Sequence, residues 1–509
     1  MERGTAALLL ALNVLAAGVL YTRFSDTEAG NKLILNAQAL ISRVMPSKVT
    51  TCGLLHWDKF TLVSERVVFP DGVRPAALHI EGGKIVSITY DTDISGPTVL
   101  SFKTGVISPG VIDVHAHLNE PGREEWEGIS TGTLAAAVGG VTTVVDMPLN
   151  SDPVTTVLPR LQDKQIAAKR KAHTHVGYWG GIVPDNAARH DVLGALVKGG
   201  ALGFKSFMCH SGINDFPNVE AKDIAAALPF LKRTGVPFYV HAEVVSPVAG
   251  AGEGNPRVYE TYMNTRPPKF EQDAIRLLVE LLDNDTTPAA PGFSVHIAHL
   301  ADAGCLPIIK EAQARHPITV ETCAHYLTFN KDMVPDGETQ YKCAPPIRGP
   351  ENQGALAAAV VSGDIALVSS DHSPAPPDMK QLDTGNFLKA WGGISGIQYL
   401  LPATWSALQP RGVGLAQLAA ILSERPAALA GLAGRKGRLA VGYDADIVVW
   451  EPEHAANTSV SANQHRHKIS PYTNLPLQGK TIATVVQGHF VHLLGSLTKQ
   501  PCGGPITNK

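Results

Sequence analysis

Short apolar segments alternate with amphipathic helical patterns between residues 109 and 435, and this alternation is the strongest constraint on the fold. Repeated strand–helix units predict a parallel sheet, whose strands are buried on both faces and are therefore apolar almost throughout. Eight such units over this length predict an α/β fold, a (β/α)8 TIM-like barrel. The candidate strands are residues 105–114, 141–146, 175–182, 202–207, 237–241, 293–299, 318–323 and 365–370.

The two ends of the chain carry a different pattern. Between residues 51 and 108, short alternating segments surround a turn at Gly82 and Gly83, which predicts a hairpin, and the segment 436–509 continues in the same style. We therefore expect 51–108 and 436–509 to form one small β-sandwich domain beside a barrel of residues 109–435. Residues 26–50 look like an amphipathic helical connector ending near Pro46.

Residues 6–21 form an apolar run that only Asn13 interrupts and that follows a single arginine, Arg3. The run is shorter than the roughly 20 residues that span a bilayer as a helix. It therefore predicts a signal or signal-anchor segment over 1–25, entry into the endoplasmic reticulum and secretory pathway, and membrane association through this segment. The alternatives are a helix packed on the protein body and a cytoplasmic protein.

Composition excludes some function classes. The formal net charge is -3 and no long basic run is present, so we expect no nucleic-acid partner. The six cysteines contain no C-x-x-C pair, which excludes a structural zinc knuckle and a disulfide scaffold. We interpret them as ordinary reduced thiols.

Polar residues gather where the predicted strands end. His115 and His117 end the first strand and share a face, because alternate residues of a strand point the same way. Active sites of such barrels lie at the carboxyl ends of the strands. We therefore expect these two histidines to meet four residues from other strand ends, namely Lys205, His241, His299 and Asp371.

Three further histidines lie near these residues. Alternation places His296 on the opposite face from His299, so we expect His296 to point toward the helical layer. His325 and His372 lie near the same rim and are expected to contact the substrate or support the metal ligands.

The residue types suit metal-assisted hydrolysis. Imidazoles favour zinc, with manganese and cobalt as alternatives. Two divalent ions about 3.5–4 Å apart can activate water and polarise a carbonyl, and they need a bridging anion between them. No glutamate offers itself among the strand-end residues. A buried lysine loses its proton readily and can then add carbon dioxide, so a carbamate on Lys205 is the candidate bridge.

Residues 113–122, with the sequence DVHAHLNEPG, resemble the signature of the cyclic amidohydrolases, the family of dihydroorotases, hydantoinases and allantoinases. Residues 203–208, GFKSFM, resemble the segment that carries the carboxylated lysine of that family. The resemblance implies a metal-dependent hydrolase with two divalent ions. One ion would be held by His115, His117 and Asp371 and the other by His241 and His299, with carboxylated Lys205 bridging. It also implies that Asp371 is the catalytic acid–base group.

Six segments resemble the allantoinases of that family in particular: 119–128, 146–151, 321–327, 342–348, 369–374 and 390–394. Dihydroorotases typically carry arginine where this chain has Asn119, and asparagine at the place of Cys343. Without a guanidinium to pair with a carboxylate, Asn119 suits a neutral ureido group. The resemblance therefore implies hydrolysis of allantoin to allantoate in purine (ureide) catabolism. It makes Asn119, His325 and Cys343 candidate substrate contacts.

Two alternatives stay open. One is a hydantoinase or dihydropyrimidinase type of cyclic amidohydrolase. The other, from a different class, is a non-catalytic assembly protein related to dihydropyrimidinase, which would lack metal ligands. The family precedent also implies a homotetramer.

Overall fold

The structure is a computed structural model that describes residues 52–507, so the signal segment and connector predicted over 1–50 lie outside the described residues. Eight parallel strands form one sheet in chain order. At its edges, Ala116 forms a parallel bridge with His372, which curls the sheet into a near-closed barrel. The predicted (β/α)8 barrel is confirmed. Its strands are β6 (Val111–Ala116), β7 (Val141–Asp146), β8 (His175–Gly181), β9 (Gly203–Phe207), β10 (Phe238–His241), β11 (Val295–Ile297), β12 (Ile318–Cys323) and β13 (Leu367–Ser369).

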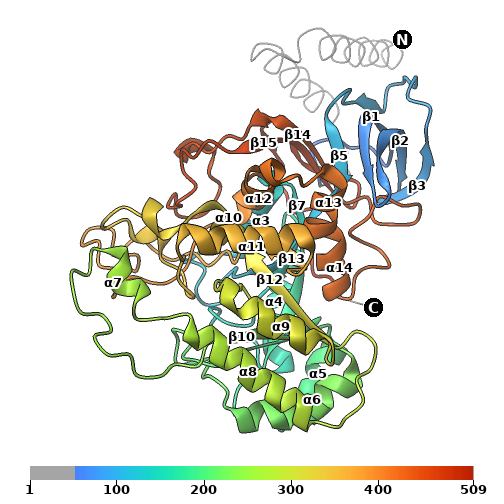
Figure 1. Cartoon of the computed structure of the whole chain (residues 1–509). Helices are drawn as coiled ribbons and strands as arrows, with labels where there is room; N and C mark the ends of the chain where they lie inside the picture. The colour runs from blue at the N-terminus through green and yellow to red at the C-terminus, as the bar shows by residue number, and fades with distance from the viewer. Residues whose placement is uncertain (1–51, 508–509) are drawn as a thin grey trace, which may run out of the picture.

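Helices cover the outside of the barrel (Figure 1). Helix α8 shows why: its buried residues Phe270, Ala274, Ile275, Leu278 and Leu282 recur every three or four positions and form one apolar face. The longer helices are α3 (Ile129–Val138), α4 (Leu158–Lys171), α5 (His190–Gly199), α6 (Ala221–Thr234), α8 (Lys269–Asn284), α9 (Leu306–Gln313), α11 (Pro350–Ser362) and α12 (Leu400–Leu408).

Shorter helical turns lie in the connections between these elements. They are α7 (Tyr259–Met263), α10 (Ala324–Thr328), α13 (Leu415–Ala419), α14 (Arg425–Leu429), the π-helix η6 (Ala420–Glu424) and the 3-10 turns η1 (Ala303–Cys305), η2 (Lys331–Met333), η3 (Thr339–Tyr341), η4 (Ile397–Tyr399), η5 (Gln409–Arg411) and η7 (Val460–Ala462). Within residues 52–507, no helix has both the length and the apolar character needed to cross a membrane.

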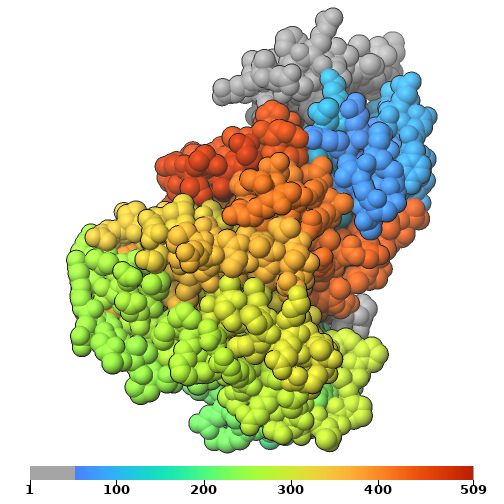
Figure 2. Space-filling view, in the orientation of Figure 1, coloured from blue at the N-terminus to red at the C-terminus, as the bar shows by residue number. Residues whose placement is uncertain are grey.

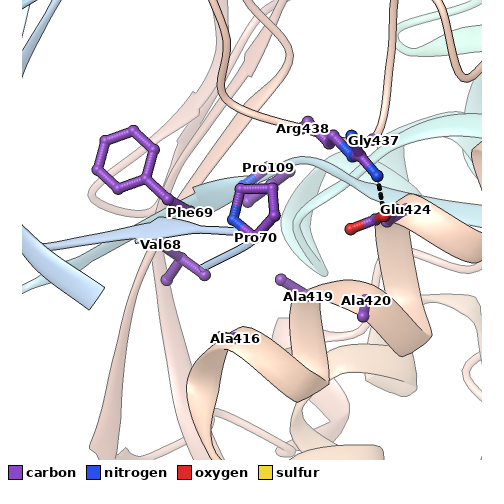
Figure 3. Close-up of a pocket in the computed structure, with 10 residues that line it drawn as sticks. All are labelled: Val68, Phe69, Pro70, Pro109, Ala416, Ala419, Ala420, Glu424, Gly437 and Arg438. Carbon is purple, nitrogen blue, oxygen red and sulfur yellow. Dashed lines mark hydrogen bonds and ion pairs between the residues drawn. The ribbon is translucent and has the colours of Figure 1, made fainter. Parts of the chain in front are cut away.

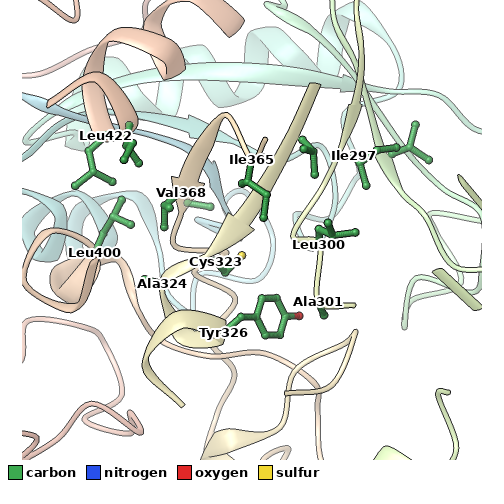
Figure 4. Packing of buried hydrophobic residues seen from close by; sticks show 14 of the residues in the cluster. Ile297, Leu300, Ala301, Cys323, Ala324, Tyr326, Ile365, Val368, Leu400 and Leu422 are labelled. Carbon is green, nitrogen blue, oxygen red and sulfur yellow. The ribbon is translucent and has the colours of Figure 1, made fainter. Parts of the chain in front are cut away.

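The barrel wall is packed with aliphatic side chains. Ile297 and Val368 on the strands belong to the same buried cluster as Leu400 and Leu422 on the helices that cover them (Figure 4). Buried aliphatic side chains of this size each contribute about 1.5–3 kcal/mol relative to exposure. This packing holds the strands as a rigid frame, and the polar groups at their carboxyl ends take their positions from it.

Both ends of the chain build one nine-stranded sheet beside the barrel. Strand β14 pairs with β5 in antiparallel register, with Val449 opposite Ile107, and so joins the C-terminal strands to the N-terminal ones. The two segments lie side by side as blue and red regions in Figures 1 and 2. The prediction of a β domain built from both termini is confirmed. Its strands are β1 (Lys59–Phe69), β2 (Gly72–Glu81), β3 (Lys84–Thr89), β4 (Val99–Ser101), β5 (Val106–Pro109), β14 (Ile447–Ala455), β15 (Gln478–Val486), β16 (His489–Leu493) and β17 (Ser496–Leu497).

The first candidate strand, residues 105–114, is two strands in two different sheets. Gly110 separates β5 in the terminal sheet from β6 in the barrel. A Cβ atom at Gly110 would lie 2.3 Å from the side chain of Thr142, so the backbone passes where only glycine fits. The continuous apolar pattern concealed this break, because both halves are buried.

The last described residues leave the terminal sheet and reach the barrel. The backbone N–H of Val176, near the amino end of β8, donates to Gly504 O at 2.9 Å, and Ile506 N–H donates back to Val176 O at 2.9 Å. The Ile506 side chain is buried in a cluster that includes Leu202. The C-terminal tail is therefore fastened to the barrel at the end opposite the predicted metal ligands.

A hollow between β1 and the helical turns before β14 lies at the junction of the two parts (Figure 3). Its only charged side chains, Glu424 and Arg438, are bonded to each other. None of the predicted site residues lines it. We assign the hollow to imperfect packing between the sheet and the barrel.

Candidate metal centre

Three of the predicted ligands meet at the carboxyl ends of the strands. Nε2 of His115 and Nε2 of His117 lie 3.3 Å and 3.6 Å from Oδ1 of Asp371. One ligand atom from each of the three residues falls within 4.8 Å of the other two, and all three side chains are buried. Two imidazoles and a carboxylate at this spacing can hold one divalent ion.

The next two predicted ligands adjoin this group. The ring of His299 lies 4.5 Å from that of His241 and 5.2 Å from that of His115, measured between centroids. His299 therefore stands between the first group and His241. The four imidazoles form one continuous cluster, large enough to provide ligands for a second ion.

Lys205 completes the cluster. Its side chain on β9 is fully buried, and Nζ has no hydrogen-bond partner among the described residues. Burial lowers the pKa of Lys205 to about 8, although Glu321 and Asp371 oppose that shift. A buried amine without a partner is costly, which indicates that this site is built for a group that would satisfy it.

The protonation states suit metal binding. Burial lowers the pKa of His117, lowers that of His241 to about 4, and lowers that of His299 well below its usual range. Burial alone would raise the pKa of Asp371, but His115 and His117 lower it to about 2. At neutral pH His117, His241 and His299 are therefore neutral and Asp371 is ionised, the forms in which these groups bind metal ions.

Two carboxylates orient the histidines. Nδ1 of His115 donates to Glu321 at 2.5 Å, and Nε2 of His241 donates to Glu243 at 2.6 Å. Glu243 is in turn held by Arg266. Each bond fixes the tautomer, leaving Nε2 of His115 and Nδ1 of His241 free as ligand atoms.

Glu321 lies at the site, although the sequence offered no glutamate as the bridging anion. It projects from β12 into the cluster, but its oxygens already accept bonds from His115, from the Tyr239 hydroxyl at 2.8 Å and from the His299 backbone N–H at 3.2 Å. Glu321 therefore orients ligands rather than bridging ions. The position of Glu321 two residues before Cys323, where β12 ends, is the signal that could have revealed it.

The expectation for His296 was wrong. Its ring lies 4.2 Å from that of Tyr239 inside the barrel, and Nε2 lies 3.6 Å from Glu321. Alternation fails as an argument here because β11 ends at Ile297 and His299 follows in a left-handed conformation with φ of 37°. Asn119 and Asp371 share this rare conformation, with φ of 64° and 42°. Such strain in non-glycine residues concentrates at functional sites.

The candidate substrate contacts differ in what surrounds them. Asn119 is fully buried, and neither its amide oxygen nor its amide nitrogen has a partner among residues 52–507. His325 interacts electrostatically with Asp371, and burial lowers the pKa of His325 to about 4. Cys343 is buried and donates to Pro345 O at 3.3 Å. His372 is turned toward Glu127, at 3.4 Å. Asn119 thus has the most unused hydrogen-bonding capacity.

A second group with metal-ligand spacing, formed by Cys209, His241 and Glu243, has another explanation. Arg266 bonds both Cys209 and Glu243. Burial raises the pKa of Cys209 to about 12, so the thiol keeps its proton and is a poor ligand. We assign this group to the support of His241.

The fold and the cluster define a barrel protein with a divalent-metal site at the carboxyl ends of its strands. The sequence model of the amidohydrolase family matches residues 106–491, and the chain belongs to that family.

Several similar proteins are named allantoinase. The chain is 47% identical to a probable allantoinase of Oryza sativa subsp. japonica, covering 90% of this chain and 92% of the relative. It is 45% identical to the allantoinase of Arabidopsis thaliana (89% and 92% covered) and 38% identical to that of Saccharomyces cerevisiae (83% and 91%).

Solved structures with the same fold include two related enzymes. The L-hydantoinase (dihydropyrimidinase) from Arthrobacter aurescens superposes with a TM-score of 0.80 at 26% identity, covering 88% of this chain and all of that one. The dihydropyrimidinase from Brevibacillus agri NCHU1002 gives 0.78 at 26% identity, with 88% and 98% covered.

The orienting role of Glu321 can be tested by metal binding. Glu321→Gln removes the charge that holds His115 in its ligating tautomer, and such changes typically weaken metal affinity about 10–100-fold. Titration of the metal-free protein against a chelating dye measures the loss, and circular dichroism checks the fold. Glu424→Gln, in a surface ion pair with Arg438, is the matched control. Equal affinity of the two variants would contradict the role.

Proposed function

We propose that this protein is an allantoinase, which hydrolyses the hydantoin ring amide of allantoin to give allantoate in purine (ureide) catabolism. The observation that carries the proposal is the convergence of His115, His117, Lys205, His241, His299 and Asp371 on one rim of the barrel. The proposal is also supported by the relatives: the chain matches proteins named allantoinase over about nine-tenths of their length.

The alternatives fit less well. A non-catalytic assembly protein would have no use for a full set of buried metal ligands. A hydantoinase or dihydropyrimidinase is favoured only by the solved structures, at 26% identity, against 47% for an allantoinase relative.

The substrate proposal rests on Asn119. Its unpaired amide offers both a donor and an acceptor, which matches the neutral ureido arm of allantoin. A dihydroorotate carboxylate at the same place would be desolvated without a paired cation, which is costly. His325, neutral and close to Asp371, and the buried Cys343 are the other proposed contacts.

We propose zinc as the metal, in two sites, since imidazoles dominate the ligand set; manganese and cobalt are the alternatives. His115, His117 and Asp371 would hold one ion, His241 and His299 the other. When bound, such ions lower the pKa of water and polarise the carbonyl under attack.

We further propose that Lys205 reacts with carbon dioxide. The neutral amine attacks the carbon atom, a C–N bond forms, and the amine loses a proton, which leaves a carbamate anion. The support is that Nζ is buried, has no partner and has a lowered pKa. A carbamate would bring negative charge to a place surrounded by imidazoles.

Asp371 is the proposed proton carrier. It is ionised at neutral pH and lies against His115 and His117 at the centre of the cluster. It can accept a proton from the attacking water and deliver it to the departing ring nitrogen, a role in which one group serves as base and then as acid.

A substrate comparison tests the proposed function. We expect kcat/KM for allantoin to exceed that for dihydroorotate and dihydrouracil by orders of magnitude, because a site built around polar groups rejects substrates that leave them unpaired. Activity should disappear with a chelator and return with zinc, and metal analysis of the purified protein identifies the ion. Faster turnover of dihydrouracil or dihydroorotate would refute the assignment.

Lys205→Ala should lose both metal and activity, because the bridging anion is gone. Added acetate or propionate, supplying a carboxylate in the vacated space, should restore part of both. Mass spectrometry of the native protein would show the added carbon dioxide. Full metal content and turnover in Lys205→Ala would rule out the bridge.

Asp371→Asn keeps the shape of the side chain but cannot accept a proton. We expect the rate to fall at least about 10²–10⁴-fold, the usual contribution of an acid–base group, while the melting curve keeps its form. Glu424→Gln, in the surface ion pair with Arg438, is again the control. A rate for Asp371→Asn within threefold of the parent would exclude Asp371 as the base.

For the ends of the molecule that the structure does not describe, we propose that residues 1–25 direct the protein to the endoplasmic reticulum, on the basis of the apolar run 6–21. Deleting them should make the protein cytosolic and leave turnover unchanged. Fractionation that finds the full chain soluble in the cytosol would overturn this.

We also propose a homotetramer, which sedimentation of the purified protein would test.

A further inference from the structure

Two cysteines outside the metal centre lie next to each other, although they come from opposite ends of the described chain. Cys52 and Cys502 are both partly exposed, whereas Cys209, Cys305, Cys323 and Cys343 are buried. The side chains of Cys52 and Cys502 share a hydrogen bond. Nothing in the proposed hydrolysis uses this pair.

Strand β16 holds Cys52 in place. Leu54 N–H donates to Phe490 O at 2.8 Å, which fixes the segment along the strand. Gly53 bends it with φ of 95°, and a Cβ atom there would lie 3.4 Å from Cβ of His489. The His489 imidazole hydrogen-bonds the Cys52 thiol.

The same strand also holds the segment that carries Cys502. Thr498 N–H donates to Val491 O at 3.0 Å, and the Cys502 side chain packs against a buried cluster that contains Val491. The Gly53 backbone hydrogen-bonds Cys502 as well. One rigid strand thus places both thiols, so their proximity does not depend on a loose contact.

We propose that Cys52 and Cys502 are the site of a disulfide bond that links the start of the terminal sheet to the C-terminal tail. This goes beyond the proposed hydrolase function and does not depend on it. The interpretation of all six cysteines as ordinary reduced thiols would then hold only for the four buried ones.

The two thiols differ in acidity, which decides which of them attacks first. Hydrogen bonds from Cys502 and His489 lower the pKa of Cys52 to about 5, whereas the pKa of Cys502 is raised. Cys52 is therefore the thiolate at neutral pH and the attacking group. In the buried thiols the pKa is raised instead, to about 12 for Cys209 and Cys343, and these stay inert.

The oxidant is a small-molecule disulfide such as oxidised glutathione. The Cys52 thiolate attacks one sulfur atom of the oxidant, forms a mixed disulfide and releases one thiolate. The hydrogen bond and charge of the Cys52 thiolate, which raised the pKa of Cys502, are then gone. Cys502 loses its proton to solvent and attacks the Cys52 sulfur, which forms the Cys52–Cys502 bond and releases the second thiolate. The protein gives up two electrons, and the oxidant is reduced to two thiols.

The bond would stabilise the fold because of where it lies. Directly after Cys502, Gly503 N–H donates to Ala172 O at 3.0 Å and the tail pairs with β8. The bond would close a loop that contains the whole barrel, and long closed loops lose the most conformational entropy in the unfolded chain. It would also keep the tail on the barrel.

Thiol counting on the folded full-length protein tests the proposal. The reduced chain has six cysteines; after excess oxidised glutathione at neutral pH and removal of the reagent, denatured protein should show two fewer thiols. Non-reducing peptide mapping should find one cross-linked pair, Cys52 with Cys502. Retention of all six thiols, or a stable glutathione adduct on Cys52, would overturn the proposal.

Single variants separate the two steps. Cys502→Ser should stop at a Cys52–glutathione adduct, and Cys52→Ser should react far more slowly. His489→Asn should slow the reaction of Cys52 about tenfold.

The oxidised parent should melt higher than the reduced parent by a few degrees, on the order expected for a native disulfide, and the double variant Cys52→Ser/Cys502→Ser should show no such difference. Identical melting of oxidised and reduced parent would contradict the stabilising role.

Discussion

The carboxylate of Glu321 is the interaction on which the rest of the metal centre depends. It joins three strands, because it accepts hydrogen bonds from His115 on β6, from Tyr239 on β10 and from the backbone of His299 beyond β11. The bond to His115 is also what directs Nε2 of that histidine toward Asp371. A single buried charge therefore aligns ligands of both proposed ions, and the rigid barrel wall keeps it in register.

Burial gives the site its chemistry. It keeps His117, His241 and His299 neutral and makes the Lys205 amine easy to deprotonate. It also leaves Lys205 and Asn119 without partners among the described residues, and unsatisfied polar groups in a packed interior are costly. Both residues project from carboxyl-end segments, where ligands bind in such barrels. The absence of water around these two groups destabilises the protein when nothing is bound. It would also strengthen each contact that they make to metal or substrate.

The local patterns of the sequence were sufficient to predict the barrel, and the residues predicted as ligands lie together at its strand ends. Strands such as 141–146 and 318–323 are apolar, short and bounded by helical patterns, and the structure has them as β7 and β12 with those bounds. The orientation of individual side chains is harder to predict. His296 and Glu321 lie inside the barrel, where their roles come from contacts with other strands. Glu243 follows β10 and bonds His241 at the end of that strand. Period-two alternation also ceases where a residue such as His299 turns left-handed.

Contacts between distant segments account for the remaining differences. No local pattern near residue 110 predicts that β5 pairs with β14. The glycine at residue 110, where the two strands separate, is required by the side chain of Thr142 on the neighbouring strand. Cys52 and Cys502 are scattered in the sequence for the same reason: their thiols meet only because both segments pack against β16. The terminal sheet is therefore more than a support for the barrel. It brings the two ends of the described chain together, and the tail that starts at Cys502 carries that connection to β8, the barrel strand next to the one that bears Lys205.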